Sequence, residues 1–535
     1  MSNPQTLHAT PTGSKQAIIV ITVILASVME LIDTTIVNVA LNEMAGSLGA
    51  TIEDVAWVIT SYAIANVIII PMTGFLGEYF GRKNYYLTSI VIFTIASYFC
   101  GTSGDLPTLV FWRFIQGIGG GALLSTSQSL LFDAFPPQKR GVASGLFGMG
   151  IILGPTLGPY VGGLIIDNYH WSAIFFVNIP IGILAAASTY LYIDQRAGEG
   201  KRKAQIKIDY LGILLLMVGV GSLQFVLEKG ESEDWFDSRM IIGFVAAAVV
   251  GIIGFIWREL TTDQPVVNIR VMKDRTLALT TILSFVAGIG LFTSVFVYPV
   301  LVQRISGYTA TMTGLSLLWP TMAGVILMPI LGKRLSAGAS PLPFITIGMI
   351  LMIVFGFEAG NFTADASQWQ WFPVQLLRVA GISMLQLPLI NQAVAGLSPK
   401  DYPAGIAINN MIRQLGGAFG IALANNFVVQ RYAQHRSDLM VNMDPANPLF
   451  VDRLETLKRG MMSVSGDAVQ ATAQAYRQLG LMVDKQSYLL AYLDTFRIVS
   501  IFFIAIMPLL FFMRTKKKTA EEAAAQAKMA AEAAH

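Results

Sequence analysis

Long apolar runs alternate with short polar segments along almost the entire chain. Each run approaches or exceeds the roughly 20 predominantly apolar residues that a helix needs to cross the hydrocarbon core of a bilayer. Lipid offers the backbone no hydrogen-bond partners, so we expect each run to be a helix that satisfies its own peptide groups. The pattern predicts fourteen spans, at residues 17–38, 55–77, 86–103, 107–131, 142–165, 173–193, 210–227, 240–257, 277–302, 309–331, 342–360, 370–396, 403–429 and 494–513.

The first six and the last six spans share landmarks, which indicates an internal repeat. An arginine stands in the fourth span of each set, Arg113 in RFIQG and Arg378 in RVAG, and paired glycines stand in the fifth. Two related halves around a site near the membrane midplane are typical of secondary transporters. We therefore predict an all-α polytopic membrane protein, divided into an N-terminus (1–16), a six-helix bundle (17–193), a linker with two inserted spans (194–276), a second six-helix bundle (277–513) and a tail (514–535).

Lysine and arginine gather in every second connecting segment. This bias indicates orientation, because basic residues are retained on the cytoplasmic side of a membrane. The richer segments contain Lys15, Arg82, Lys83, Lys139, Arg140, residues 196–207, residues 258–275, Lys333, Arg334 and Lys400. Both termini are therefore predicted to be cytoplasmic. The long segment 430–493 then lies outside, and its apolar residues at helical spacing predict an ordered helical excursion.

Composition narrows the class of protein further. Of the 535 residues 54% are hydrophobic and only 13% charged, whereas a soluble chain carries about a quarter charged residues. The net charge of +3, without a basic patch interleaved with aromatic residues, argues against nucleic acid as a partner. Cys100 is the only cysteine and the four histidines are scattered, so we expect no disulfide and no metal centre. A membrane-embedded enzyme would need clustered metal ligands or histidines, and a channel or sensor would not need a two-half repeat, so these classes are weaker alternatives.

Charged side chains inside the predicted spans are the strongest functional signal. Each costs at least about 2.5 kcal/mol at the centre of a spanning helix. Glu30 and Asp33 share one face of the first span, and Arg113 stands in the fourth with Gln116 one turn further on. Two carboxylates and a guanidinium around one cavity would suit proton exchange, because burial and a nearby cation act in opposite directions on the acid. A buried ion pair that only joins the two helices is the structural alternative.

Polar residues elsewhere in the apolar spans are candidates for lining a substrate cavity. Hydrogen bonding between helices is their commoner use, so both interpretations stay open. The candidates are Thr34, Asn38, Tyr62, Asn66, Gln116, Gln386, Asn391, Asn409 and Arg413.

Glycines in the fifth span recur every four residues, at Gly150, Gly154, Gly158 and Gly162. They form a smooth stripe on which another helix can pack closely. Pro155 and Pro159 each remove a backbone donor and can bend this helix, which suits a helix that seals one side of a cavity. Simple small-residue packing explains the stripe equally well when it is considered alone.

Several segments resemble the fourteen-helix drug:proton antiporter branch of the major facilitator superfamily. They are LIDTTIVNVAL (31–41), GFLGEYFGRK (74–83), RFIQGIGGG (113–121) and GIILGPTLGPYVGG (150–163). Two more, VAWVITSYAIANVIIIPMTG (55–74) and HWSAIFFVNIPIG (170–182), are similar to multidrug exporters of that branch. The resemblance covers nearly the whole chain.

The resemblance implies export of amphipathic drugs by alternating access, driven by the proton gradient without a cofactor. It implies that Asp33 is the proton-linked acid, with Arg113 as its partner. It also implies that Gly74, Glu78, Gly81, Arg82 and Lys83 form a gating loop, in which Glu78 and Arg82 could latch helix ends; the alternative is that Arg82 and Lys83 only set the orientation. A bacterial inner-membrane location follows, with a periplasmic adaptor and an outer-membrane channel as partners in a Gram-negative cell. Stability or self-association is the plainer use of the outer segment 430–493.

The chain also departs from that family's pattern. Glu78 and Tyr79 replace the usual Asp-Arg pair, Asn42 replaces a proline, and Glu30 occupies a position that is usually uncharged. We hypothesise that Glu30 carries a second proton when the substrate is a cation. An exporter of a lipid, a siderophore or another endogenous amphiphile is the alternative function.

Overall fold

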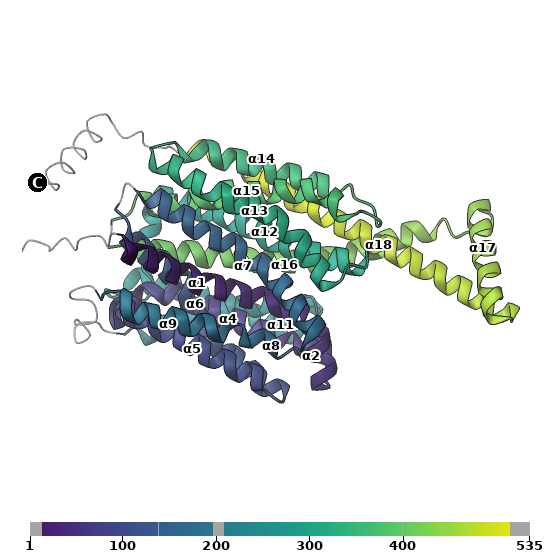
Figure 1. Ribbon diagram of the computed structural model, residues 1–535, viewed down its shortest axis with the longest axis horizontal. Helices are drawn as coiled ribbons and strands as arrows, with labels where there is room; N and C mark the ends of the chain where they lie inside the picture. The colour runs from purple at the N-terminus through teal and green to yellow at the C-terminus, as the bar shows by residue number, and fades with distance from the viewer. Residues whose placement is uncertain (1–12, 137–138, 196–207, 399, 514–535) are drawn as a thin grey trace, which may run out of the picture.

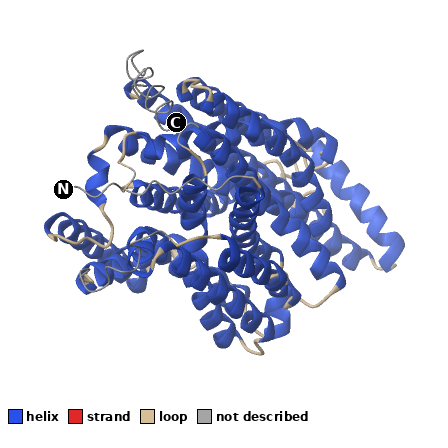
Figure 2. Cartoon of the chain, turned by 60° about the vertical axis from the view of Figure 1, so that its left-hand side comes forward, coloured by secondary structure: helices blue, strands red, loops and turns tan. Residues whose placement is uncertain are grey.

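The computed structural model describes residues 13–136, 139–195, 208–398 and 400–513, and all regular elements in these ranges are helices (Figure 2). The long helices of the first half follow one another with short connections. They are α1 (Ser14–Ile36), α4 (Trp57–Phe80), α5 (Arg82–Thr102), α6 (Leu106–Ala134), α7 (Arg140–Asn168) and α9 (Asn178–Tyr192). Three shorter helices, α2 (Leu41–Leu48), α3 (Ile52–Val55) and α8 (Ala173–Phe176), lie between them.

Two further helices, α10 (Tyr210–Lys229) and α11 (Arg239–Thr261), separate the first half from the second. The second half contains α12 (Arg275–Arg304), α13 (Ala310–Ser336), α14 (Pro341–Ala359), α15 (Gln368–Ala395), α16 (Tyr402–Met440), α17 (Pro448–Ser465) and α18 (Ala468–Ile506). Several starts are set by local capping. The Asp105 side chain accepts from Thr108 N at the start of α6, and the Asp274 side chain accepts from Leu277 N at the start of α12. Such caps satisfy backbone donors that the first turn of a helix leaves free.

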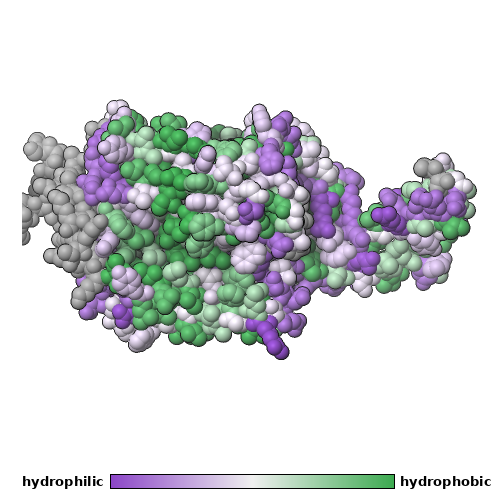
Figure 3. Space-filling model, turned by 90° about the horizontal axis from the view of Figure 1, so that it is seen from below, coloured by the Kyte–Doolittle hydropathy of each residue, from purple (hydrophilic) through white to green (hydrophobic). Residues whose placement is uncertain are grey.

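Twelve helices in the described ranges are long and apolar enough to cross a bilayer. The helices α6 and α16 are not among these twelve. Both nevertheless pack inside the bundle, α6 against α4 and α5, and α16 against α12. On the face that Figure 3 shows, apolar side chains cover the middle of the bundle and more hydrophilic side chains lie toward its two ends.

The two halves meet along two pairs of helices, α7 with α13 and α4 with α16. In the first pair, α7 and α13 approach each other closely because glycines lie at their contact. A Cβ atom at Gly332 would lie 2.4 Å from the Gly141 carbonyl oxygen, and one at Gly145 would lie 2.8 Å from the Met328 carbonyl oxygen. The backbones of α7 and α13 are therefore in direct contact.

The glycine stripe of α7 faces a different neighbour, α1. A Cβ atom at Gly154 would lie 2.4 Å from Leu31 Cβ, and one at Gly162 would lie 2.6 Å from a methyl group of Val39. Gly150 and Gly158 meet α1 in the same way. Pro155 and Pro159 lie within α7, which is helical from Arg140 to Asn168. One helix thus touches α1 in its own half and α13 in the other.

The ends of α16 and α18 extend beyond the bundle, and α17 connects them (Figure 1). This extension lies at the end of the molecule opposite the start of α1 (Figure 1). Leu454, Ala475 and Leu479 form a small apolar core within it. The predicted last span starts at residue 494, where the composition becomes apolar. The helix itself begins at Ala468, and in its added part the apolar residues Ala471, Ala475 and Leu479 recur at helical spacing and are buried.

We expect Gly154→Ala to lower the thermal stability of the purified protein, since the added methyl group would force α7 away from Leu31. Overpacking of this kind costs about 1–3 kcal/mol. The matched control is Gly243→Ala in α11, where an added Cβ has no neighbour within 4 Å. That change should leave stability equal or raise it by up to about 1 kcal/mol, because alanine is the better helix former. An unchanged melting temperature for Gly154→Ala would contradict the close packing.

Candidate functional site

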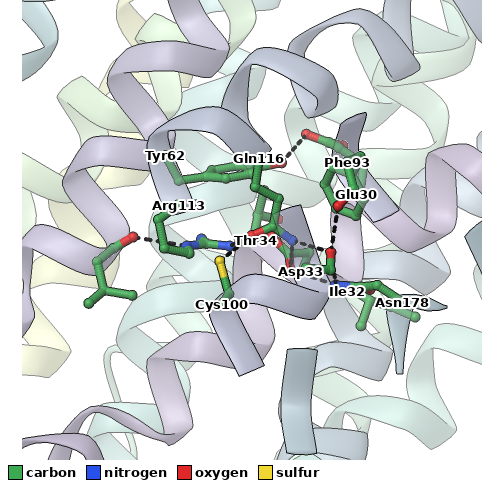
Figure 4. Close-up of polar contacts among 12 residues, drawn as sticks. Glu30, Ile32, Asp33, Thr34, Tyr62, Phe93, Cys100, Arg113, Gln116 and Asn178 are labelled. Carbon is green, nitrogen blue, oxygen red and sulfur yellow. Dashed lines mark hydrogen bonds and ion pairs between the residues drawn. The ribbon is translucent and has the colours of Figure 1, made fainter. Parts of the chain in front are cut away.

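Asp33 on α1 and Arg113 on α6 form an ion pair in the interior of the first half (Figure 4). Arg113 Nη1 donates to Asp33 Oδ2 at 2.6 Å, and the two side chains are 1% and 0% exposed. Arg113 Nε donates to the Val58 carbonyl oxygen at 3.0 Å. A charge buried in this way is tolerated only when it is paired and hydrogen-bonded, and both conditions are met. In this conformation Asp33 is enclosed by protein rather than open to a water-filled cleft.

Two amide side chains complete the set of donors around Asp33. Gln116 Nε2 and Asn178 Nδ2 each donate to Asp33 Oδ1 at 2.8 Å. Ser97 Oγ accepts from the same two amides, at 2.7 Å from Gln116 and 3.3 Å from Asn178. An ionised carboxylate is a pure acceptor, so three N–H donors suit the charged form of Asp33. These three donors leave one of the roughly four lone-pair positions of the carboxylate unoccupied.

Tyr62 lies between this ion pair and Glu30, the second acid of α1 (Figure 4). The Arg113 guanidinium carbon lies 4.2 Å from the centre of the Tyr62 ring, a distance at which the cation and the ring attract each other. The Tyr62 hydroxyl is 3.5 Å from Glu30 Oε1, and Asn66 Nδ2 donates to the same oxygen at 3.2 Å. These long contacts bind Glu30 more loosely than Asp33 is bound.

Residues of the second half approach Glu30 from α16 and α15. Gln414 Nε2 donates to Asn66 Oδ1 at 2.9 Å, so the amide that contacts Glu30 also joins the two halves. Arg413 is close enough to Glu30 for an electrostatic interaction. Its Nη1 donates to Gln386 Oε1 at 3.3 Å. The structure therefore gathers Tyr62, Asn66, Gln116, Gln386 and Arg413 from the predicted cavity residues in or beside one polar region.

The remaining cavity candidates have other surroundings. Thr34 is half-buried and its hydroxyl donates to the Leu31 carbonyl oxygen within α1. Asn38 is exposed in a short 3₁₀ turn, Val37–Val39. Asn391 accepts a hydrogen bond from Ser144 across the two halves, nearer the end of α15. Asn409 is buried one turn before Arg413.

The gating segment contains a different ion pair from the one considered in the sequence. Arg82 pairs with Asp133 on α6, whereas Glu78 is exposed. The backbone explains the difference, because Gly81 has a φ of 84° and ends α4 at Phe80. Glu78 and Arg82 consequently lie on two separate helices and not one turn apart on the same helix. Lys83 Nζ donates to the Tyr190 carbonyl oxygen, and Gly74 lies against Pro403 of the other half.

The sequence analysis did not single out Asn178 and Ser97. Asn178 lies in the segment 170–182 that resembles multidrug exporters, but it carries no charge that would have marked it out, and Ser97 is one of several hydroxyl residues in its apolar run. Their function depends on which helices are neighbours, and α1, α5, α6 and α9 meet only in the folded bundle. Within the ranges that the structure covers, no three or more His, Cys, Asp or Glu side chains are placed to hold a metal ion.

A helical membrane bundle of two halves with buried charges at its centre is typical of transport proteins. The Major Facilitator Superfamily matches residues 23–421, and the chain belongs to this family. It is therefore a multi-pass membrane transport protein and not an enzyme.

Relatives and solved structures agree with this assignment. The Multidrug export protein EmrB of Escherichia coli (strain K12) is 36% identical over 85% of this chain and 89% of its own length. The Fatty acid resistance protein FarB of Neisseria gonorrhoeae is 32% identical over 93% of this chain and 96% of its own. The human organic anion transporter MFSD10 shares the fold, with a TM-score of 0.59 at 14% identity over 92% of this chain and 99% of that one. The resemblance to multidrug exporters of this superfamily is thus confirmed.

Cys100 offers a native reporter of the Asp33 site. It is fully buried, and its sulfur lies 3.6 Å from Gln116 Oε1. We expect N-ethylmaleimide to react slowly with the parent and at least about tenfold faster with Arg113→Gln, because losing one member of a buried ion pair costs about 3–5 kcal/mol and every 1.4 kcal/mol raises the open population tenfold.

The control for the cysteine measurement is Arg378→Gln, which removes a buried arginine of the second half. Its reaction rate should match that of the parent. Equal rates for the parent and Arg113→Gln would mean that the ion pair does not hold this region closed.

Proposed function

We propose that the chain is a proton-coupled antiporter that exports hydrophobic or amphipathic drugs by alternating access. The observation that carries the proposal is the Asp33 carboxylate, fully buried and held by Arg113, Gln116 and Asn178. A titratable group in this position can exist charged only while its donors surround it. The multidrug export relative supports drugs as the substrate class.

The free energy of one proton is of the right size to drive the change. Breaking a buried ion pair by neutralising one partner costs about 3–5 kcal/mol. A proton moving inward releases about 2.3 kcal/mol per 100 mV and about 1.36 kcal/mol per pH unit. At 100 mV and one pH unit together, one proton supplies about 3.7 kcal/mol, which reaches the lower part of the cost of separating Asp33 from Arg113.

The packing of α1 supplies a route from Asp33 to the contact between the halves. When the ion pair opens, α1 is free to shift relative to α6. The glycines of α7 follow α1 closely on one face, and α7 touches α13 on the other. In the proposed cycle the contact between α7 and α13 rearranges and the drug leaves on the outside. Asp33 then releases its proton to the cytoplasm, and the carboxylate pairs with Arg113 again.

For the topology we propose fourteen spans with both termini in the cytoplasm of a bacterial cell, in its inner membrane. The interior positions of α6 and α16 support adding them to the twelve apolar helices. The distribution of lysine and arginine supports the orientation. The helices beyond the bundle, α17 with the ends of α16 and α18, would then project into the periplasm.

This projection is the proposed contact for a periplasmic adaptor, which would link the transporter to an outer-membrane channel in a Gram-negative cell. Its support is the length of helix that stands free of the bundle (Figure 1). Export of a lipid, a siderophore or another endogenous amphiphile is the second candidate function. The name of the FarB relative, a fatty acid resistance protein, favours that candidate.

The transport proposal is tested in everted membrane vesicles acidified by respiration. Adding ethidium, dansylcadaverine or rhodamine should collapse the pH gradient when the parent protein is present, because each exported molecule lets protons out. With Asp33→Asn, the collapse should fall to the level of vesicles that lack the protein, since an amide cannot exchange a proton.

The control is Asp105→Asn, an exposed acid at the start of α6 whose asparagine replacement can still cap the helix. It should behave as the parent does. Dye-induced proton release at the parent rate in Asp33→Asn would refute the assignment of Asp33.

A further inference from the structure

Four buried polar atoms between the halves lack hydrogen-bond partners in the described part of the chain. They are Glu30 Oε2, Asn409 Oδ1, Arg413 Nε and Gln386 Nε2. Glu30 is 3% exposed and Arg413 is 6% exposed, so bulk water does not satisfy them. Buried polar atoms of folded proteins are nearly always paired with protein or with ordered water, so four exceptions in one region mark a place where water or a ligand can bind.

These atoms belong to one cluster. Arg413 contacts Gln386, and Asn409 precedes Arg413 by one turn of α16. Asn66 touches Glu30 and is held by Gln414, the residue after Arg413. The cluster therefore has an acidic side on α1 and a basic side on α15 and α16, which belong to opposite halves.

The two charges of the cluster interact without forming a direct ion pair. Glu30 and Arg413 are close enough to influence each other electrostatically, yet no salt bridge between them is present among the described residues. Each charge keeps one unused atom. Glu30 and Arg413 belong to opposite halves, so a movement that separates the halves would also separate these two side chains.

We propose that this cluster binds a zwitterionic amphiphile, a molecule with an ammonium group and a carboxylate on an apolar body. The ammonium would donate to Glu30 Oε2 and Asn409 Oδ1, and the carboxylate would accept from Arg413 Nε and Gln386 Nε2. Two free acceptors and two free donors match these two groups, whereas a cation would leave Arg413 unpaired and an anion would leave Glu30 unpaired. The inference rests on the proposed export function and names the substrate class of that site.

A zwitterion also suits proton exchange. Because its net charge is zero, one proton drives it with both the electrical and the chemical part of the gradient. At 100 mV and one pH unit that sustains about a 500-fold gradient, whereas a single cation exchanged for one proton reaches only about tenfold. Glu30 then needs no second proton, in contrast to our hypothesis for a cationic substrate.

Three probes that share a dansyl group and a linker of the same length distinguish a zwitterionic, a cationic and an anionic ligand. Nε-dansyl-lysine is zwitterionic, dansylcadaverine lacks its carboxylate, and dansyl-aminocaproate lacks its ammonium. Binding to the purified full chain in nanodiscs is followed by dansyl fluorescence. We expect the zwitterion to bind at least about tenfold more tightly than either other probe, the value of one charge-assisted hydrogen bond.

Single substitutions test which residue recognises the ammonium group and which recognises the carboxylate. Glu30→Gln should remove most of the advantage over dansyl-aminocaproate and keep the advantage over dansylcadaverine. Arg413→Gln should do the reverse. Arg378→Gln, a buried arginine two turns of α15 away from Gln386, should leave both ratios as in the parent. Because each ratio is measured within one preparation, a lower yield of folded variant does not affect it.

Equal affinities for the three probes, or tightest binding of dansylcadaverine or dansyl-aminocaproate by the parent, would overturn the inference. So would ratios that Glu30→Gln and Arg413→Gln leave unchanged. If proton-coupled dye export still depends on Asp33 in these cases, the proposed function stands and only the substrate class fails. A parent protein that gives no dye-induced collapse in the vesicle assay, or an Asp33→Asn variant that gives the full collapse, would instead refute the proposed function itself.

Discussion

The ion pair between Asp33 and Arg113 places the strongest constraint on this protein. In a helical bundle surrounded by lipid, neither charge can be left alone, because an unpaired buried charge is too costly. The surrounding polar groups, Gln116, Asn178 and the Val58 carbonyl oxygen, are arranged to satisfy this one pair. Neutralising the acid would therefore leave a buried guanidinium without its partner, which favours a movement of α6 relative to α1.

The packing around the ion pair determines which neighbouring helices such a movement would displace. Tyr62 touches the guanidinium with its ring and reaches Glu30 with its hydroxyl, so the two acids share a neighbour. Asn66 continues this polar connection to Gln414 in the other half. On the opposite side of α1, the glycines of α7 leave no space for independent motion. A change at Asp33 can thus reach both contacts between the halves.

Much of the helical arrangement could be predicted from the sequence, because a run of apolar residues long enough to span a bilayer has few alternatives to a helix. The pairing of Asp33 with Arg113 was predictable for a similar reason, since buried charges need partners. Periodicity shows which face a residue occupies but not which helix lies opposite. Asn178 and the pairing of Arg82 with Asp133 therefore emerged only from the structure. The free atoms of Glu30 and Arg413 required the two halves to be placed together.

The central claim is that Asp33 itself takes up and releases the transported proton. Infrared difference spectra of the purified protein, recorded between acidic and alkaline pH, report this directly through the carbonyl band of a protonated carboxylic acid. Other carboxyl groups also contribute to this band, so the account predicts one component of it, present in the parent and in Asp105→Asn, that is missing in Asp33→Asn. A spectrum of Asp33→Asn identical to that of the parent would contradict it.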